Sequence, residues 1–325
     1  MKPLVFYLAL LFFFCFLDVY FGSVKIHFSF SDSYSFKIAK FRMTEMFQSM
    51  LAGAILALCG AVLQKILKNP LADPFILGIS SGGSCFSAIF VLLNLSVYFS
   101  FFQLDSFFPL QSIVSFIGCM FAFFFILSFK NKIKSHQEEY SYLIIGIILN
   151  SFFSAVLLIT ISLSDQSQLS QIHNWLIGSL QPISFLQIIA LLIFCVPCVF
   201  FILKESKLIH LLMFEDTFSK SLGIQPERLR NKLIFLICIL ISIVVSISGS
   251  IGFIGLIIPH YVQKLHRSFI LQELILTMIC GALVLVFADF LSRVLIPPSQ
   301  LPIGIFTALI GAPALAFILL KRSQV

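Results

Sequence analysis

The feature that most constrains this chain is a series of apolar runs, each close to the length of a membrane-spanning helix. Leu110–Phe129, Tyr142–Leu163 and Ile183–Leu203 contain no charged residue. A helix needs about 20 apolar residues to cross the hydrocarbon core of a bilayer, because it rises about 1.5 Å per residue. Several such runs in one chain predict an all-α polytopic membrane protein.

The composition agrees with this class and leaves no room for a second domain. The chain is 59% hydrophobic and 11% charged, whereas soluble domains are about 25% charged. No polar stretch is long enough to build another domain, so residues 1–325 are predicted to form a single transmembrane domain.

About ten spans are expected. Pro3–Phe21 is interpreted as an uncleaved helix, not as a signal peptide, because no small-residue cleavage site follows it. The expected spans are Pro3–Phe21, Met46–Leu67, Phe75–Leu95, Leu110–Phe129, Tyr142–Leu163, Ile183–Leu203, a span that begins at Leu233, Ile251–Leu265, Leu274–Val294 and Ile303–Leu320.

The stretch Leu233–Arg267 is ambiguous, because two standard spans need about 40 residues. A single crossing would separate Lys264 from the basic residues Arg228, Arg230 and Lys232. Two crossings keep them together, so the positive-inside rule favours a tight hairpin with a short second helix. In that topology most of the 21 Lys and Arg residues, and both termini, lie in the cytoplasm.

The most distinctive segment joins the second and third spans. It reads GAILALCGAVLQ from Gly53 and, after a basic break, NPLADPFILGISSGG from Asn69. Gly53 and Gly60 place small residues on one helix, where another backbone can approach closely. Asp73 before Pro74 is the expected N-cap of the third span.

Three further segments carry distinctive residues: Trp175–Ser179 (WLIGS), Ser248–Arg267 (SGSIGFIGLIIPHYVQKLHR) and Ala288–Pro313, which contains ADFLSR and LPIGIFTALIGAP. Together with the opening hairpin, they resemble the FecCD-type (BtuC-like) permeases, the membrane subunits of ABC importers for iron-siderophore, haem and cobalamin. The resemblance covers roughly Arg42–Leu320. It implies the all-α fold of type II importer permeases.

The sequence contains no sign of an enzyme. No phosphate-binding loop for ATP, no metal-ligand cluster and no nucleophile–base pair is recognisable. The eight cysteines all lie in apolar runs, where they are expected to act as small core residues. No catalytic residue, cofactor or metal is therefore expected. Basic residues interleaved with aromatics are also lacking, which argues against nucleic-acid binding.

Energy for transport would then have to come from separate ATPase subunits. The longest hydrophilic stretch, Lys204–Lys232, is the candidate docking platform, with a solvated loop as the alternative from sequence alone. The resemblance implies that residues 207–230 form the coupling segment, two short helices that fit a cleft of the ATPase. The contact residues that it implies are Phe218, Lys220, Leu222 and Gly223.

The resemblance also implies a docking site for a periplasmic or lipid-anchored binding protein. Arg42 and Arg293 match family positions that pair with its acidic residues, while snorkelling to the membrane boundary is the alternative for both. The family often has a second Arg where this chain has Glu45. Docking is therefore expected to be weaker, or to use Lys37 and Lys40.

The cytoplasmic gate of the family lies at the start of the fifth span, where this chain has Glu139, Tyr140 and Ser141. A solvated loop position is the alternative for the glutamate. The resemblance places the translocation pathway between two permease subunits, so that a homodimer or a paired heterodimer is expected.

The predicted function is the permease subunit of an ABC importer for a ferric chelate, haem or cobalamin in the bacterial inner membrane. The alternative is a secondary transporter driven by an ion gradient, which would keep ionisable residues inside the membrane near its substrate. The long spans are nearly free of such residues, since Asp18 and Asp289 lie near their expected outer ends. Asp289 also lies one helical turn before Arg293, where an ion pair is expected.

Overall fold

The computed structural model describes residues 2–21, 33–95, 109–130, 138–180, 183–266, 269–297 and 300–322. These residues form thirteen α-helices and no strand, which confirms the all-α prediction. The helices are α1 (Lys2–Tyr20), α2 (Ser33–Ile66), α3 (Ile79–Leu92), α5 (Leu110–Lys130), α6 (Glu138–Leu163), α7 (Gln166–Ile177), α8 (Phe185–Lys204), α9 (Ser206–Leu212), α10 (Asp216–Ser221), α11 (Pro226–Ser248), α12 (Ile254–Leu265), α13 (Ile270–Val294) and α14 (Ile303–Arg322).

Ten of these helices correspond to the ten expected spans. Six contain segments long and apolar enough to cross a membrane, namely α2, α5, α6, α8, α11 and α13. Shorter apolar segments lie in α1 (Leu4–Tyr20), α3 (Ile79–Leu92) and α14 (Ile303–Ala316), and the twelve-residue α12 completes the set. The ambiguous stretch contains two helices, α11 and α12, as the charge distribution predicted.

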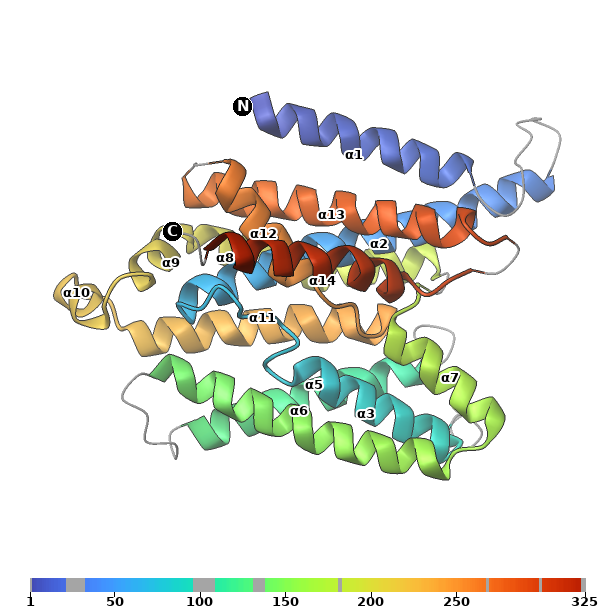
Figure 1. The fold of residues 1–325 in the computed structure, drawn as a ribbon, viewed down its shortest axis with the longest axis horizontal. Coiled ribbons are helices and arrows are strands. Elements are labelled where there is room, and N and C mark those ends of the chain that lie inside the picture. Colours follow the sequence, from blue (N-terminus) through green and yellow to red (C-terminus); the bar gives the residue numbers. More distant parts are fainter. Residues whose placement is uncertain are drawn as a thin grey trace.

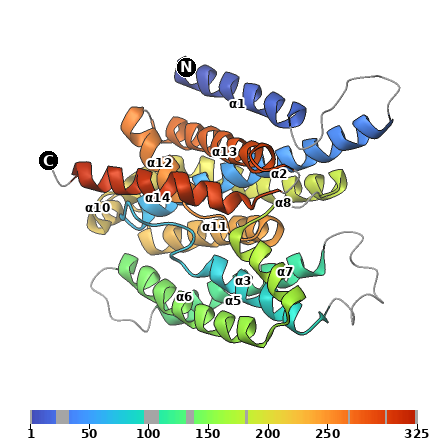
Figure 2. The same ribbon diagram turned by 45° about the vertical axis from the view of Figure 1, so that its right-hand side comes forward.

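The helices form an elongated bundle in which α2 is central (Figures 1 and 2). In both views α1 lies along one edge beside α13, whereas α3, α5 and α6 lie along the opposite edge. In its most apolar stretch, 78% of the residues of α2 are buried, compared with 22% for α8. The core of the bundle is therefore built around α2, and α8 presents most of its surface outward.

Glycines bring the backbone of α2 into direct contact with its neighbours. A Cβ atom on Gly60 would lie 1.9 Å from the carbonyl oxygen of Gly255 in α12. A Cβ atom on Gly53 would lie 2.3 Å from the carbonyl oxygen of Gly281 in α13. No side chain fits at either crossing, which agrees with the close approach expected from the small residues.

The expected start of the third span is wrong. Residues 74–78 form turns, and α3 begins only at Ile79, after Gly78 in a left-handed conformation at φ +75°. Asn150 of α6 supports this irregular segment, because its Nδ2 donates hydrogen bonds to the carbonyl oxygens of Phe75 (2.9 Å) and Ile76 (3.3 Å). Such bonds satisfy polar groups that would be costly in a membrane. They explain why the local Asp-Pro signal does not decide where the helix begins.

The second span also begins earlier than expected, at Ser33 and not at Met46. No Gly or Pro lies between these two positions, so nothing in the local sequence stops the helix from extending beyond its apolar stretch.

The segments singled out from sequence meet at one place. The amide of Ser179 donates to the carbonyl oxygen of Ser248 (3.1 Å). A Cβ atom on Gly304 in α14 would lie 1.7 Å from the carbonyl oxygen of Ile177 at the end of α7. The WLIGS, SGSIG and LPIGI stretches thus form a single contact between α7, α11 and α14.

The glycine crossings can be tested with one added methyl group. We expect Gly60→Ala to destabilise the protein by about 1–3 kcal/mol through overpacking, measured as a lower thermal unfolding midpoint in detergent. Gly252→Ala is the matched control, because its Cβ atom would meet only one ring carbon of Phe75, at 3.9 Å. Equal unfolding midpoints for the two variants would contradict the crossing.

Candidate functional site

The helices α9 and α10 project from one end of the bundle, beyond the ends of the long helices (Figure 1). Their polar sequence surrounds several exposed apolar side chains. Met213, Phe214, Phe218 and Leu222 are 45%, 49%, 48% and 54% exposed. Charged residues such as Glu215 and Lys220 lie beside them and are also exposed, so these apolar side chains form a candidate contact for another protein.

Two of the expected coupling residues complete this surface. Lys220 is exposed at the end of α10, and Gly223 follows with φ +77°. A Cβ atom on Gly223 would meet nothing within 4 Å. The chain thus leaves open space at this turn. We call residues Met213–Gly223 the coupling knuckle.

Directly after the coupling knuckle, the first two turns of α11 carry side chains that bind other helices. Arg230 is completely buried. Its Nε donates to the carbonyl oxygen of Ile66 at the end of α2 (3.2 Å), and its Nη2 donates to Asp216 Oδ1 in α10 (3.2 Å). Lys68 Nζ reaches the same Asp216 oxygen at 3.2 Å. The guanidinium therefore joins the C-terminus of α2, where positive charge is favourable, to α10.

The next residue, Asn231, binds a different pair of helices. Its Oδ1 accepts hydrogen bonds from Lys130 Nζ of α5 (2.7 Å) and from the Tyr142 hydroxyl of α6. Lys130 Nζ also donates to the Tyr142 hydroxyl (3.2 Å) and lies 3.3 Å from Glu227 Oε1. These contacts fix the end of α5 and the beginning of α6 against α11.

The expected gate residues lie at the beginning of α6. Ser141 is buried there. Glu139 and Tyr140 lie in the first turn, but their side chains fall outside the described ones. Tyr142, which is only 1% exposed, opens the fifth span, but no role was predicted for its side chain. A tyrosine hydroxyl at the start of an apolar run indicates that a polar partner is needed. The sequence could not identify that partner, because Asn231 is far away along the chain.

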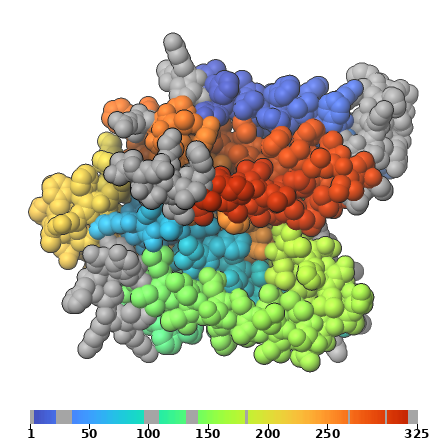
Figure 3. Space-filling model, viewed as in Figure 1, coloured from blue at the N-terminus to red at the C-terminus, as the bar shows by residue number. Residues whose placement is uncertain are grey.

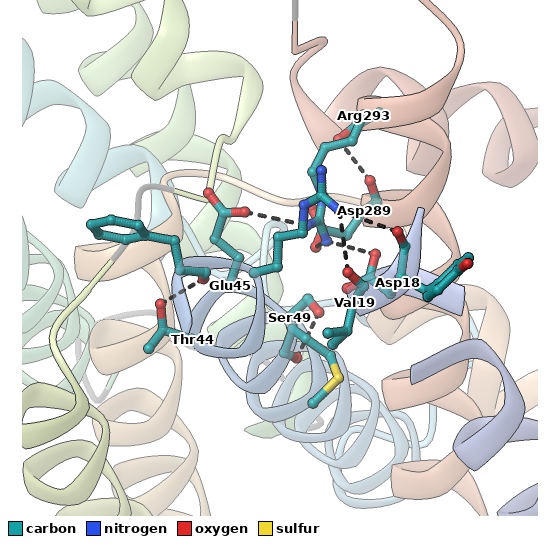
Figure 4. A network of polar contacts seen from close by, with 12 residues as sticks. Asp18, Val19, Thr44, Glu45, Ser49, Asp289 and Arg293 are labelled. Carbon is teal, nitrogen blue, oxygen red and sulfur yellow. Dashed lines mark hydrogen bonds and ion pairs between the residues drawn. The ribbon is translucent and has the colours of Figure 1, made fainter. Parts of the chain in front are cut away.

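At the opposite end of the bundle, Arg293 lies among three carboxylates (Figure 4). Its Nη2 is 2.6 Å from Asp18 Oδ1 of α1 and also bonds Asp289, one turn earlier in α13. Its Nη1 is 3.4 Å from Glu45 Oε2 of α2. The expected Asp289–Arg293 pair is confirmed. We call these four residues the outer cluster; it ties α1, α2 and α13 together.

Arg42 is likewise turned inward. Its Nη1 donates to the carbonyl oxygens of Val19 (3.2 Å) and Tyr20 (3.3 Å) at the end of α1. Arg42 and Arg293 are 6% and 7% exposed, so neither guanidinium is presented at the surface. Lys37 and Lys40, on the same helix as Arg42, are exposed.

The described residues contain no cluster of His, Cys, Asp and Glu that could hold a metal ion. All eight cysteines are free; six of them are buried, as expected for small core residues, whereas Cys15 and Cys198 are half-buried. The sites of interest are thus the coupling knuckle with the helix contacts behind it and, at the other end, the outer cluster.

Comparison with known proteins identifies the family. A model of the FecCD transport family matches residues 8–321. The chain belongs to the FecCD transport family. A probable iron chelatin permease of Helicobacter pylori is 33% identical over 93% of this chain and 89% of its own. The vitamin B12 permease BtuC of Vibrio cholerae is 31% identical (86% and 82%), and the molybdate permease MolB of Haemophilus influenzae is 33% identical (88% and 82%).

A solved structure agrees with this assignment. A metal-chelate type ABC transporter in an inward-facing conformation has a TM-score of 0.83 and 29% identity, covering 98% of this chain and 99% of that one. The protein is thus a multi-pass permease subunit of an ABC importer, and ATP hydrolysis lies on a separate ATPase subunit. The alternative of a transporter driven by an ion gradient finds no support in these matches.

The internal role of Arg293 in the outer cluster can be tested by substitution. We expect Arg293→Met to destabilise the purified permease by about 3–5 kcal/mol, because three buried carboxylates lose their counter-charge. Lys40→Met, which removes an exposed charge from a neighbouring helix, is the control. Thermal unfolding in detergent, with no binding protein present, measures both. An unfolding midpoint that Arg293→Met leaves unchanged would refute an internal role.

Proposed function

We propose that this permease imports a metal-containing chelate of the ferric-siderophore, haem or cobalamin type across the bacterial inner membrane. It would work as a homodimer or paired heterodimer with two cytoplasmic ATPase subunits and a periplasmic or lipid-anchored binding protein. The names of the iron chelatin and B12 relatives and the metal-chelate type structure support this cargo. The molybdate relative makes a small oxyanion the competing cargo.

The observation that carries the proposal is the coupling knuckle. Exposed Phe218 and Leu222, the cation Lys220 and the open turn at Gly223 offer a mixed apolar and basic surface outside the membrane. A permease that hydrolyses no ATP needs such a contact, because the ATPase can act on it only through surfaces that touch. This end of the protein, with both termini, would then lie in the cytoplasm, as the positive-inside rule requires.

The second permease subunit would pack against the face that Figure 3 shows, where α14 (red) and α6 (green) lie on either side of residues that follow α2 (cyan). The exposed side of α6 supports this choice. Only 28% of its apolar stretch is buried, and Ile144, Ile147 and Phe152 are exposed. The pathway would run between the two copies, with Glu139, Tyr140 and Ser141 at its cytoplasmic gate.

The binding protein would dock on Lys37 and Lys40 rather than on Arg42 and Arg293. The two lysines are exposed, whereas both arginines would first have to leave their internal partners. The outer cluster would instead hold the surface that carries these lysines in place.

The proposed function is tested by uptake into proteoliposomes that contain the permease, its ATPase subunits and its binding protein. We expect ATP-dependent uptake of one of three probes, a ferric siderophore, haemin or cyanocobalamin, and no uptake of molybdate. Uptake of molybdate alone would overturn the cargo. Failure of the ATPase subunits to co-purify with the permease would overturn the whole assignment.

The same vesicles test the coupling knuckle. We expect Lys220→Glu to lower uptake by roughly tenfold, which corresponds to about 1.4 kcal/mol, while ATP hydrolysis continues. Gly223→Trp should act in the same way by filling the open turn. Gly223→Asn is the matched control, because Asn tolerates the left-handed conformation. Full uptake in both test variants would refute the contact.

The docking surface has its own test. We expect the double change Lys37→Glu and Lys40→Glu to weaken binding-protein association roughly tenfold or more, because rim charges of opposite sign attract across an interface. Surface plasmon resonance on permease in nanodiscs measures the dissociation constant. Lys204→Glu, at the other end of the bundle, is the control, and equal constants for the two would contradict this surface.

A further inference from the structure

The first two turns of α11 contain two consecutive polar residues with different partners. Successive residues of a helix point about 100° apart, because the helix has 3.6 residues per turn. Arg230 therefore faces α2 and α10, whereas Asn231 faces α5 and α6.

We propose that Arg230 and Asn231 are positioning residues that pass a displacement of α10 to two transmembrane helices, to α2 through Arg230 and to α6 through Asn231. This inference rests on the proposed function, because a nucleotide-driven ATPase is what would displace α10. The resemblance marks residues 207–230 as the coupling segment but gives no role to the side chains of Arg230 and Asn231.

The branch to α2 depends on a buried charge. Arg230 is the largest fully buried side chain among the described residues, and its carboxylate partner is Asp216 of α10. Beside this pair, α10 is held to α9 by the Ser219 hydroxyl, which donates to the carbonyl oxygen of Leu211 (3.0 Å). Moving Asp216 away would separate a buried cation from a carboxylate that neutralises it, which is unfavourable. The guanidinium, and with it the end of α2 at Ile66, is therefore expected to follow α10.

The branch to α6 depends on a buried hydroxyl. Tyr142 is 1% exposed and donates to Asn231 Oδ1, which Lys130 also binds. A rotation of α11 that separated Asn231 from Tyr142 would break this part-buried hydrogen bond, at a cost. The beginning of α6, where the gate is proposed, is expected to move with α11.

Both receiving helices are packed so that a shift at their ends reaches deeper elements. The backbone of α2 touches that of α12 at Gly60 and Gly255. The backbone of α6 touches the irregular segment before α3, where a Cβ atom on Gly146 would lie 2.2 Å from the carbonyl oxygen of Ile76. Close-packed backbones of this kind cannot absorb a shift by compression.

The experiment is hydrogen exchange by mass spectrometry on the permease purified with its ATPase subunits, with and without MgATP and vanadate. In the wild type we expect the nucleotide to change exchange at α10, at the last turn of α2 and at the first turn of α6. In Asp216→Ala the change at α2 should fall at least fivefold while that at α6 persists. In Tyr142→Phe the change at α6 should fall while that at α2 persists.

Two further variants separate positioning from a general effect on stability. Asp216→Glu keeps the carboxylate and is expected to restore at least half of the response at α2. Lys232→Gln removes a neighbouring surface pair with Glu205 (2.7 Å, side chains 51% and 19% exposed) and should leave both responses unchanged.

The proposal is overturned if Asp216→Ala keeps the full response at α2, or if either variant loses both responses together, which would indicate loosening of the whole end of the bundle. Should Asp216→Ala fail to assemble, Asp216→Asn replaces it in the same comparison. A wild-type permease that binds no ATPase subunit would overturn the proposed function itself and this inference with it, and that result is visible before any variant is made.

Discussion

The crossing of α2 with α12 and α13 is the contact on which the rest of the bundle depends. At Gly60 and Gly53 the backbones meet with no side chain between them. In a bilayer there is little hydrophobic driving force between helices, so close van der Waals packing has to supply the attraction. With α2 fixed in this way, α1 and α13 pack on one side of it. On the other side α11 packs against α2 and connects it to the group formed by α3, α5 and α6 (Figure 1).

Polar side chains inside the bundle support its irregular backbone. Gln64 Nε2 donates to the carbonyl oxygens of Gly255 (3.2 Å) and Leu256 (3.1 Å) beside the glycine crossing. Gln48 Nε2 donates to that of Ile247 (2.9 Å), where α11 is about to end. Asn150 does the same for the segment before α3. Broken helices persist at membrane depth only where such partners exist.

The two ends of the bundle use charge differently. In the outer cluster Arg293 is enclosed by three carboxylates from three helices, an arrangement that locks these helices together. At the other end, Arg230 and Lys130 each contact more than one helix, but their carboxylate partners Asp216 and Glu227 remain partly exposed to water. If the ATPase subunits dock at the coupling knuckle as proposed, the more exposed contacts lie at the driven end and the more enclosed ones at the other end.

The sequence by itself determined the ten apolar spans, the α11–α12 hairpin, the short helices before α11 and the family, because apolar run length, charge distribution and signature motifs are properties of the chain alone. Only the tertiary structure decided that α3 begins at Ile79, that Arg293 is enclosed and that Tyr142 meets Asn231. Each of these depends on a partner far away along the chain: Asn150 for the segment before α3, and Asp18 for Arg293. Local propensity and motif carry no information on such partners, because burial and pairing arise only when distant helices pack.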